Sequence, residues 1–142
     1  MIENRYHLQI GDWKILQKDA RNVRAQVFIQ EQKIPEIMEW DDDDACSVHV
    51  VVYDNEHPIG TARLLPNGNL GRMAVISSYR RLGVATLMLT KLLGVAKERG
   101  DKEICISAQC AVKQFYIQHG FVQVGEEYLE VDIPHIAMRL IL

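Results

Sequence analysis

The feature that most constrains the fold is a long helical pattern, residues 81–99, that stands between two strand patterns. Apolar residues recur along one face of this helix, namely Ala85, Leu89, Leu92, Leu93 and Ala96. Gly100 follows at the position where a glycine commonly ends a helix. The flanking segments, residues 70–76 and 104–108, are short apolar runs of the kind that form strands. Because a strand, a helix and a second strand make a crossover connection, these two strands are predicted to be parallel.

Shorter patterns fill the rest of the chain. Residues 48–53 and 59–65 are predicted strands, and the turns that join them to each other and to residues 70–76 are too short for a parallel crossover. These three strands should therefore run antiparallel. The remaining predicted elements are a first helix with Asp19 as its N-cap and Pro35 beyond its end, a short helix and two closing strands, at residues 19–31, 111–119, 121–124 and 136–141.

These elements predict a mixed α/β (α+β) fold in a single domain over residues 1–142. We expect a central, mostly antiparallel sheet of six to seven strands with helices on both faces. Strands four and five, residues 70–76 and 104–108, are expected to be parallel. They should splay apart where Val75 meets the turn at Arg80, because a ligand would have to reach between them.

Charge and composition exclude several classes of function. A net charge of −3 gives no basic field for a nucleic-acid backbone. The sequence has no apolar run of the roughly 20 residues that a membrane helix needs, and its start lacks the pattern of a signal peptide. Three cysteines without C-x-x-C spacing are typical of a reducing compartment. The sequence therefore predicts a cytoplasmic protein that binds neither nucleic acid nor membrane.

An acidic run, Asp41-Asp42-Asp43-Asp44, is the one segment that suggests a cation site. Carboxylate oxygens suit Ca²⁺ or Mg²⁺, but the glycine and the terminal glutamate of an EF-hand loop are missing. A solvated acidic loop is the favoured interpretation, and attraction of a cationic amine is the second. We expect no bound metal.

Residues 71–86 carry the strongest functional signal. A strand runs through a turn into a helix start that holds Arg80, Arg81 and Gly83. The free N–H groups of a first helical turn attract anions, and a glycine lets a diphosphate approach the backbone. The segment is neither a P-loop nor a dinucleotide fingerprint, since it lacks their glycines and lysine. Taken alone, it is either a phosphate site or an ordinary helix start.

Resemblance to a known family decides between these two interpretations. The run Arg80-Arg81-Leu82-Gly83-Val84-Ala85 resembles the acyl-CoA signature R/Q-x-x-G-x-G/A of the GNAT superfamily of N-acetyltransferases. Downstream, a predicted helix with Phe115-Tyr116 followed by Gly120-Phe121 is similar to the second landmark of that family. The N-terminal half resembles the small bacterial ElaA/YjcF-like branch, through Arg24, Val27-Phe28, Glu31-Gln32, residues 39–44, His49 and Ala62-Arg63-Leu64. The resemblance implies the GNAT fold.

The resemblance also implies how the donor would be bound. Acetyl-CoA is the expected cosubstrate, with main-chain groups of Met73, Ala74 and Val75 pairing with its pantetheine arm. Its pyrophosphate would be held at the helix start, and one further contact is expected at the end of strand five. The residues implied for these two contacts are Arg80, Arg81, Leu82, Gly83, Val84, Ala85, Thr86 and Gln109.

Tyr116 is the implied general acid, standing near the CoA sulfur. A phenol with a pKa of about 10 gives a proton to a thiolate with a pKa of about 8.5 at a cost of about 2 kcal/mol. The acceptor amine must also lose a proton, because an alkyl amine is neutral only about once in 2,500 at pH 7. Many GNAT enzymes use a glutamate early in strand four for this step, where this chain has Asn69. Glu31, His49 and His135 are the candidate bases, with ordered water as the alternative.

The leading hypothesis is transfer of an acetyl group to a small-molecule or peptidyl amine, with homodimerisation left open. Two alternatives remain at this level. One is an acyl-CoA sensor without catalysis, because strand four lacks its carboxylate. The other is acyl transfer of the acyl-homoserine-lactone-synthase type, which Arg24, Phe28 and the acidic run faintly resemble.

Overall fold

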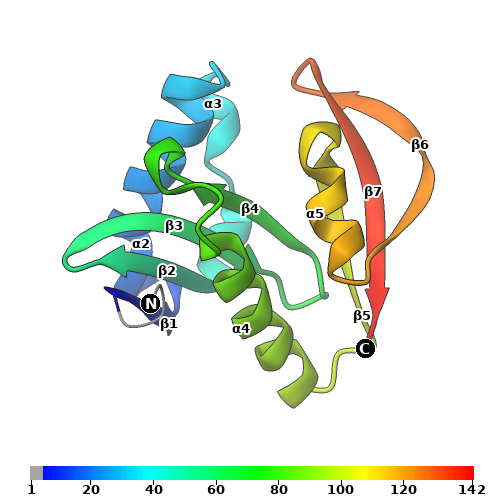
Figure 1. The fold of residues 1–142 in the computed structure, drawn as a ribbon, viewed down its shortest axis with the longest axis horizontal. Coiled ribbons are helices and arrows are strands. Elements are labelled where there is room, and N and C mark those ends of the chain that lie inside the picture. The colour runs from blue at the N-terminus through cyan, green and yellow to red at the C-terminus, as the bar shows by residue number, and fades with distance from the viewer. Residues whose placement is uncertain (1–4) are drawn as a thin grey trace.

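The computed structural model of the chain describes residues 5–142. These residues hold seven strands in two antiparallel sheets, with the orders β1-β2-β3-β4 and β5-β7-β6 (Figure 1). The first sheet consists of β1 (Tyr6–Gly11), β2 (Val48–Asp54), β3 (His57–Leu64) and β4 (Leu70–Val75). The second consists of β5 (Glu103–Gln109), β6 (Val122–Glu130) and β7 (Ile133–Ile141). The expected strands are all present, and the structure adds β1, which pairs along its whole length with β2.

The helices are α2 (Trp13–Arg24), α3 (Glu36–Glu39), α4 (Val84–Glu98) and α5 (Lys113–Gln118). The expected first helix begins earlier than Asp19, because the Asp12 carboxylate caps it by accepting a hydrogen bond of 3.0 Å from the Ile15 N–H. Asp19 instead lies within α2 and accepts a hydrogen bond from the Tyr53 hydroxyl. Beyond Arg24 the helix widens into a π-helical segment, Ala25–Glu31. Such segments are frequent at functional sites.

The two faces of the first sheet are covered by different helices. Val50 and Val52 of β2 pack in the same core cluster as Met88 of α4. The alternate residues, Val51 and Tyr53, pack with Leu16 of α2. Because successive side chains of a strand point to opposite faces, α2 and α4 lie on opposite sides of the sheet (Figure 1). The predicted mixed α/β fold with helices on both faces is confirmed.

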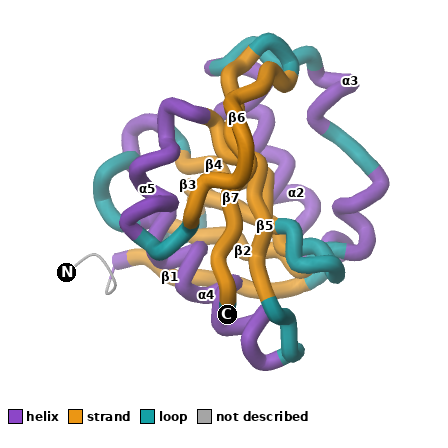
Figure 2. The backbone as a smooth tube through the Cα atoms, turned by 90° about the vertical axis from the view of Figure 1, so that its right-hand side faces the viewer, coloured by secondary structure: helices purple, strands orange, loops and turns teal. Residues whose placement is uncertain are grey.

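β4 and β5 belong to different sheets (Figure 1), and the strands of the second sheet lie in front of those of the first in Figure 2. One parallel bridge, between Asn69 and Cys105, links the chain just before β4 to β5. The bond that supports it runs from the Cys105 N–H to the Gly68 carbonyl, at 3.1 Å. The expected central sheet is therefore two sheets that meet at this bridge. The splaying of the two strands beyond it stays a prediction.

The connection between these strands is α4, which ends as predicted at Gly100. The Gly100 N–H donates to the Lys97 carbonyl and the Asp101 N–H to the Ala96 carbonyl. Gly100 has a φ of 88°, which glycine adopts without strain. Within residues 5–142, no helix is both long and apolar enough to cross a membrane.

Candidate active site

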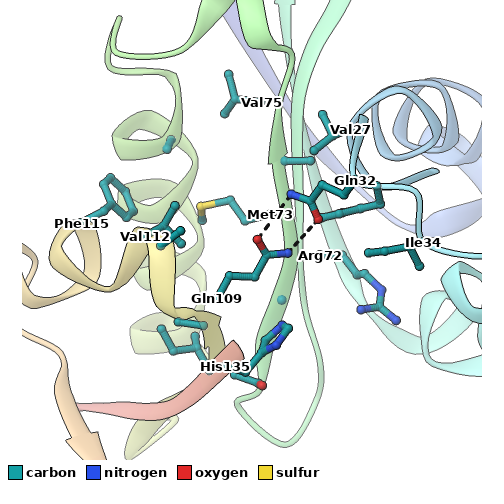
Figure 3. A pocket seen from close by; sticks show the side chains of 18 of the residues that line it. Val27, Gln32, Ile34, Arg72, Met73, Val75, Gln109, Val112, Phe115 and His135 are labelled. Carbon is teal, nitrogen blue, oxygen red and sulfur yellow. Dashed lines mark hydrogen bonds between the residues drawn. The ribbon is translucent and has the colours of Figure 1, made fainter. Parts of the chain in front are cut away.

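A cavity of about 780 Å³ lies between β4 and β5. Residues Leu70–Val75 of β4 form one wall, and residues Ile106–Gln109 at the end of β5 form another. The π-helical segment contributes Val27 and Phe28, and α5 contributes Phe115 and Tyr116. Figure 3 shows Met73 of β4 between Phe115 on one side and Val27 on the other. The cavity therefore joins parts of the chain that are far apart in sequence.

The start of α4 has the features expected of an anion site. Gly83 is the residue that precedes the helix; it has a φ of 87°, and no side chain caps the first turn. Arg81 also has a positive φ, 62°, which costs a residue other than glycine on the order of 1 kcal/mol. This tight turn leaves first-turn N–H groups of α4 without a side-chain acceptor. A phosphate group fits such a helix start.

Of the residues expected around this turn, Arg80, Arg81 and Ala85 line the cavity. Val84 is buried, and Leu82 is exposed. The turn packs closely on β3, because a Cβ on Gly60 would come within 2.9 Å of the Val84 side chain. The glycine in β3 thus allows α4 to begin directly against the sheet.

Arg80 is held by the protein itself. Its Nη atoms donate to the two Glu31 oxygens at 2.6 Å each, and its Nε donates to the Val75 carbonyl at 2.9 Å. Arg80 therefore ties the β4–α4 turn to the π-helical segment. The neighbouring Arg81 has no such ion pair among the described residues, which leaves its guanidinium available for a phosphate.

The exposed edge of β4 is the second expected donor contact. Its other edge pairs with β3, through Val75 opposite Gly60 and Ala74 opposite Thr61. β4 ends the order of its sheet, and the parallel bridge to the second sheet is at Asn69, before Met73. The backbone of residues 73–75 thus pairs with β3 on one edge and has no partner strand on the edge that borders the cavity. An extended ligand with amide groups could pair with this edge.

Tyr116 stands in the wall opposite β4. Its side chain is buried, packs edge-on against Phe115 and Phe121, and donates to the Met73 sulfur at 3.6 Å. Burial raises the pKa of the hydroxyl to about 12. The hydroxyl is therefore protonated at neutral pH and points across the cavity at β4.

Two of the expected bases lie outside the cavity wall. Glu31 is half-exposed and bound to Arg80, whose hydrogen bonds keep the pKa of the carboxyl below its usual range. His49 is buried against Trp13, its Nε2 lies 2.9 Å from the Asp44 carbonyl, and burial lowers its pKa. Neither geometry supports the expected role as base: Glu31 is held as a charged partner of Arg80, and His49 packs in the interior.

The third expected base, His135, lines the cavity. Its Nδ1 lies 2.7 Å from the Ile133 carbonyl, which only accepts, so Nδ1 carries a proton and, in the neutral ring, Nε2 is the nitrogen that can accept one. The ring stacks on Tyr128, and Nε2 lies 3.5 Å from a Glu130 carboxylate oxygen. Of the three candidates, His135 alone is placed in the wall.

Gln109, expected as a donor contact, pairs with Gln32 across the cavity. The Gln109 amide donates to the Gln32 side-chain oxygen at 2.8 Å, and the reverse contact is 3.4 Å (Figure 3). Figure 3 shows Val75 on one side of this pair and Arg72 and His135 on the other. The pair therefore divides the cavity into two ends. The end beside Val75 and the turn before α4 is the one expected to hold the donor, and is called the donor end; the end beside Arg72 and His135 is called the acceptor end.

The expected solvated acidic loop is found in part: Asp41, Asp42 and Asp43 are exposed, whereas Asp44 is buried. Asp44 and the preceding Glu39 are buried and lie on two sides of Arg24, at 2.7 and 2.8 Å. Asp41 pairs with Arg63 at 2.6 Å, and Arg63 also reaches Asp44 at 2.9 Å. The arginines come from α2 and β3, so only the tertiary fold brings these partners to the acidic residues.

Arg72 completes this group, which we call the arginine–carboxylate network: Arg24, Arg63, Arg72, Glu39, Asp41 and Asp44. Arg72 and Glu39 also line the cavity, and sequence reasoning gave neither a role at the site. The alternation of a regular strand could not have placed Arg72, because β4 is irregular there. Among residues 5–142, no group of three or more His, Cys, Asp or Glu side chains is arranged to hold a metal ion.

Comparison with known proteins agrees with this geometry. Residues 16–142 match the family model described as the acetyltransferase (GNAT) domain. The uncharacterized N-acetyltransferase YjcF of Bacillus subtilis is 37% identical over 125 residues, covering 85% of this chain and 89% of YjcF. The chain therefore belongs to the GNAT acetyltransferase family.

Two solved structures are similar to this chain over nearly its whole length. Escherichia coli ElaA is 29% identical with a TM-score of 0.84, over 94% of this chain and 99% of ElaA. An acyl-CoA N-acyltransferase from Pseudomonas aeruginosa is also 29% identical, with a TM-score of 0.86 over 95% and 99% of the two chains. The predicted ElaA/YjcF-like branch is confirmed by these relatives.

Proposed function

We propose that this acyltransferase-family protein moves an acetyl group from acetyl-CoA to a primary amine. One observation carries the proposal: a single cavity brings together the turn before α4, the unpaired edge of β4 and the Tyr116 hydroxyl. These three features suit a pyrophosphate, an amide-bearing arm and a thioester sulfur, in the order in which they occur along acyl-CoA. Residues 80–86 would hold the pyrophosphate, residues 73–75 the pantetheine arm, and Gln109 would border it.

In the proposed reaction the amine nitrogen attacks the thioester carbon directly. A C–N bond forms, the C–S bond breaks, and the sulfur leaves as a thiolate that ends as the free thiol of CoA. A neutral amine gives up one proton and the thiolate gains one, so the proton count balances; an amine that arrives as the ammonium ion first releases one more proton to solvent. The protein has to receive the first proton and supply the second.

Tyr116 would act on the leaving sulfur. With a pKa of about 12, its proton transfer to a thiolate with a pKa of about 8.5 is uphill by about 5 kcal/mol, a larger gap than a solvent-exposed phenol would face. A hydrogen bond that strengthens as charge develops on sulfur requires no complete transfer. We therefore propose that Tyr116 stabilises the departing thiolate by hydrogen bonding, and that protonation follows as the thiol forms.

His135 would receive the amine proton. In the neutral ring Nε2 would accept this proton, and Glu130 beside it would stabilise the imidazolium that forms. We propose His135 in place of Glu31 and His49 because it lines the cavity and they do not. A solvent route through ordered water would leave this residue dispensable, which a variant can test.

The experiment is a panel of primary amines with acetyl-CoA, reading release of free thiol, for the parent protein and Tyr116→Phe. The parent should turn over at least one amine, and Tyr116→Phe should lower kcat by roughly 10- to 10⁴-fold. CoA affinity, measured by calorimetry, should be the same for both, because the ring and its packing remain. Equal kcat values would contradict the role of Tyr116. CoA binding without turnover of any amine would contradict the transferase proposal and indicate an acyl-CoA sensor.

We also propose where the protein works and with which partners. The three cysteines are free, which fits a reducing cytoplasm. The partners we propose are acetyl-CoA and a small-molecule or peptidyl amine. Size-exclusion chromatography with light scattering would determine whether the chain is a monomer or a homodimer.

A further inference from the structure

Arg72 points into the cavity because β4 carries a bulge. Two residues, Arg72 and Met73, occupy the space opposite Ala62 of β3, since Thr61 faces Ala74 and Arg63 faces Gly71. Arg72 takes up the extra residue with a φ of 47°, in the left-handed region. Bulges of this kind redirect a side chain and are common beside active sites. Backbone strain at a residue other than glycine persists only where the surroundings enforce it.

Arg72 is also the least satisfied arginine of the arginine–carboxylate network. Arg24 donates three hydrogen bonds of 2.7–2.9 Å, and Arg63 donates three of 2.6–3.0 Å. Arg72 has only ion-pair contacts, 3.4 Å to Glu39 and 3.6 Å to Asp41; its buried Nε, like that of Arg63, has no hydrogen-bond partner among the described residues. The carboxylates that face it are already bound by Arg24 and Arg63.

The carboxylate opposite Arg72 is that of Glu39, and its buried position disfavours the charged form. Burial raises the pKa of the Glu39 carboxyl even though Arg72 and Arg24 lie beside it. A guanidinium whose partners are distant and shared keeps capacity for a further anion. The side chain of Arg72 is 29% exposed, whereas that of Arg24 is 1% exposed. Within the network, Arg72 is thus the cation that a molecule in the cavity can reach.

We propose that Arg72 binds a carboxylate of the acceptor, so that the amine accepted here belongs to an amino acid. The planar fork of an arginine matches two carboxylate oxygens and gives both affinity and orientation. Figure 3 shows Arg72 and His135 on the same side of the Gln32–Gln109 pair, away from Val75. An amino acid held by Arg72 there directs its amine toward the base and the donor end. The inference rests on the proposed acyl transfer and names its substrate class.

The test compares matched acceptors. The common L-α-amino acids and their carboxamides differ in the negative charge that Arg72 is proposed to bind and in the pKa of the α-amine, which is lower in the carboxamides, so kcat/KM is compared per concentration of neutral amine. With acetyl-CoA in excess, the parent protein should prefer the acid of its best pair in kcat/KM by about 10- to 100-fold, which is the effect of one hydrogen-bonded charge. Arg72→Gln should abolish this preference, mainly by raising KM for the acid. Arg72→Lys should restore part of it, since the charge returns without the fork.

Asp43→Asn, at an aspartate beside the network, is the matched control. Asp43 is half-exposed and lies 3.9 Å from Arg63, so its loss should leave the preference for acids unchanged. Far-UV circular dichroism and melting temperatures show whether each variant is folded. An Arg72→Gln protein that melts like Arg72→Lys and still prefers acids would overturn the proposal. So would a parent protein that uses carboxamides as well as acids, although acyl transfer itself would then stand.

A second measurement does not depend on turnover. With CoA present, N-acetyl-L-amino acids should raise the melting temperature of the parent protein more than N-acetyl-L-amino acid amides do. In Arg72→Gln this difference should disappear. If no amine releases thiol, the transferase proposal fails, and this binding difference alone decides whether Arg72 holds a carboxylate. Equal protection by acids and amides would overturn the inference.

Discussion

The two ends of the cavity are built in different ways. The donor end is made mostly of backbone: the turn at Gly83 and the unpaired edge of β4 lie within one stretch of the chain, residues 71–86. The end proposed for the acceptor is lined by the side chains of Glu39, Arg72 and His135, and the rest of the arginine–carboxylate network lies behind Glu39 and Arg72. Main-chain groups suit a ligand that never changes, whereas side chains can be exchanged to suit different acceptors.

The two ends should also respond differently to mutation. A change at the donor turn affects a surface loop and the ligand, with little consequence for folding. A change in the network removes one member of a buried ion pair and leaves the other without a partner. The difference can therefore be measured by comparing ligand binding with the free energy of unfolding.

The largest expected effect is on catalysis and comes from His135, which lies on the same side of the Gln32–Gln109 pair as Arg72. His135→Gln should lower kcat/KM by about 10²- to 10⁴-fold, because the amine loses its base while binding of CoA stays as it was. His57→Gln is the matched control, since His57 is exposed at the start of β3. If His135→Gln works as fast as His57→Gln, the proton leaves through water and not through His135.

The second prediction concerns the network itself. Arg24→Met should lower the free energy of unfolding by about 3–5 kcal/mol, because Glu39 and Asp44 remain buried without their partner. Arg21→Met, an exposed arginine of the same helix, should change it by less than about 1 kcal/mol. Urea denaturation followed by circular dichroism gives both values. Equal stabilities for the two variants would mean that the buried ion pairs contribute nothing specific to the fold.

The smallest expected effect belongs to the donor side. Glu31→Gln should cost about 0.2–1 kcal/mol of stability at pH 7, because its ion pair with Arg80 is half-exposed and screened. The pKa of Glu31 is lowered in the folded state, so this contribution is present above the ordinary carboxyl value of 4.5 and is lost as the pH falls below it. Denaturation of both proteins at pH 7 and pH 3 checks the sign. A difference that grows toward acid would contradict it.

Much of the donor end could be predicted from the sequence because its signals are local. The long helix, its end at Gly100 and the glycine turn before it all depend on residues close together in the chain. The family resemblance added Tyr116, which the fold places in the same cavity. The starts of helices were harder to predict. Asp19 was the expected cap of the first helix, but Asp12 caps it, and Asp19 lies within the helix, where it accepts a hydrogen bond from Tyr53.

The acceptor end could not be predicted, because its geometry depends on pairs far apart in sequence. The burial of Asp44 cannot be foreseen until Arg24 and Arg63 are placed beside it. Arg72 reaches the cavity through a bulge, and a one-residue irregularity in a strand leaves no periodic signal. His135 was one of three candidate bases, and only the fold shows that Glu31 and His49 lie outside the cavity wall.

The central claim is that the turn before α4 holds the phosphates of CoA, and calorimetric titration with CoA tests it most directly. Gly83→Glu puts a negative charge and a strained backbone where a pyrophosphate would bind, whereas Gly94→Glu makes the same change within α4, where a new Cβ meets nothing within 4 Å. We predict binding at least about 100-fold weaker for Gly83→Glu and unchanged for Gly94→Glu, a loss of about 2.7 kcal/mol. Equal affinity for the two variants would contradict the claim.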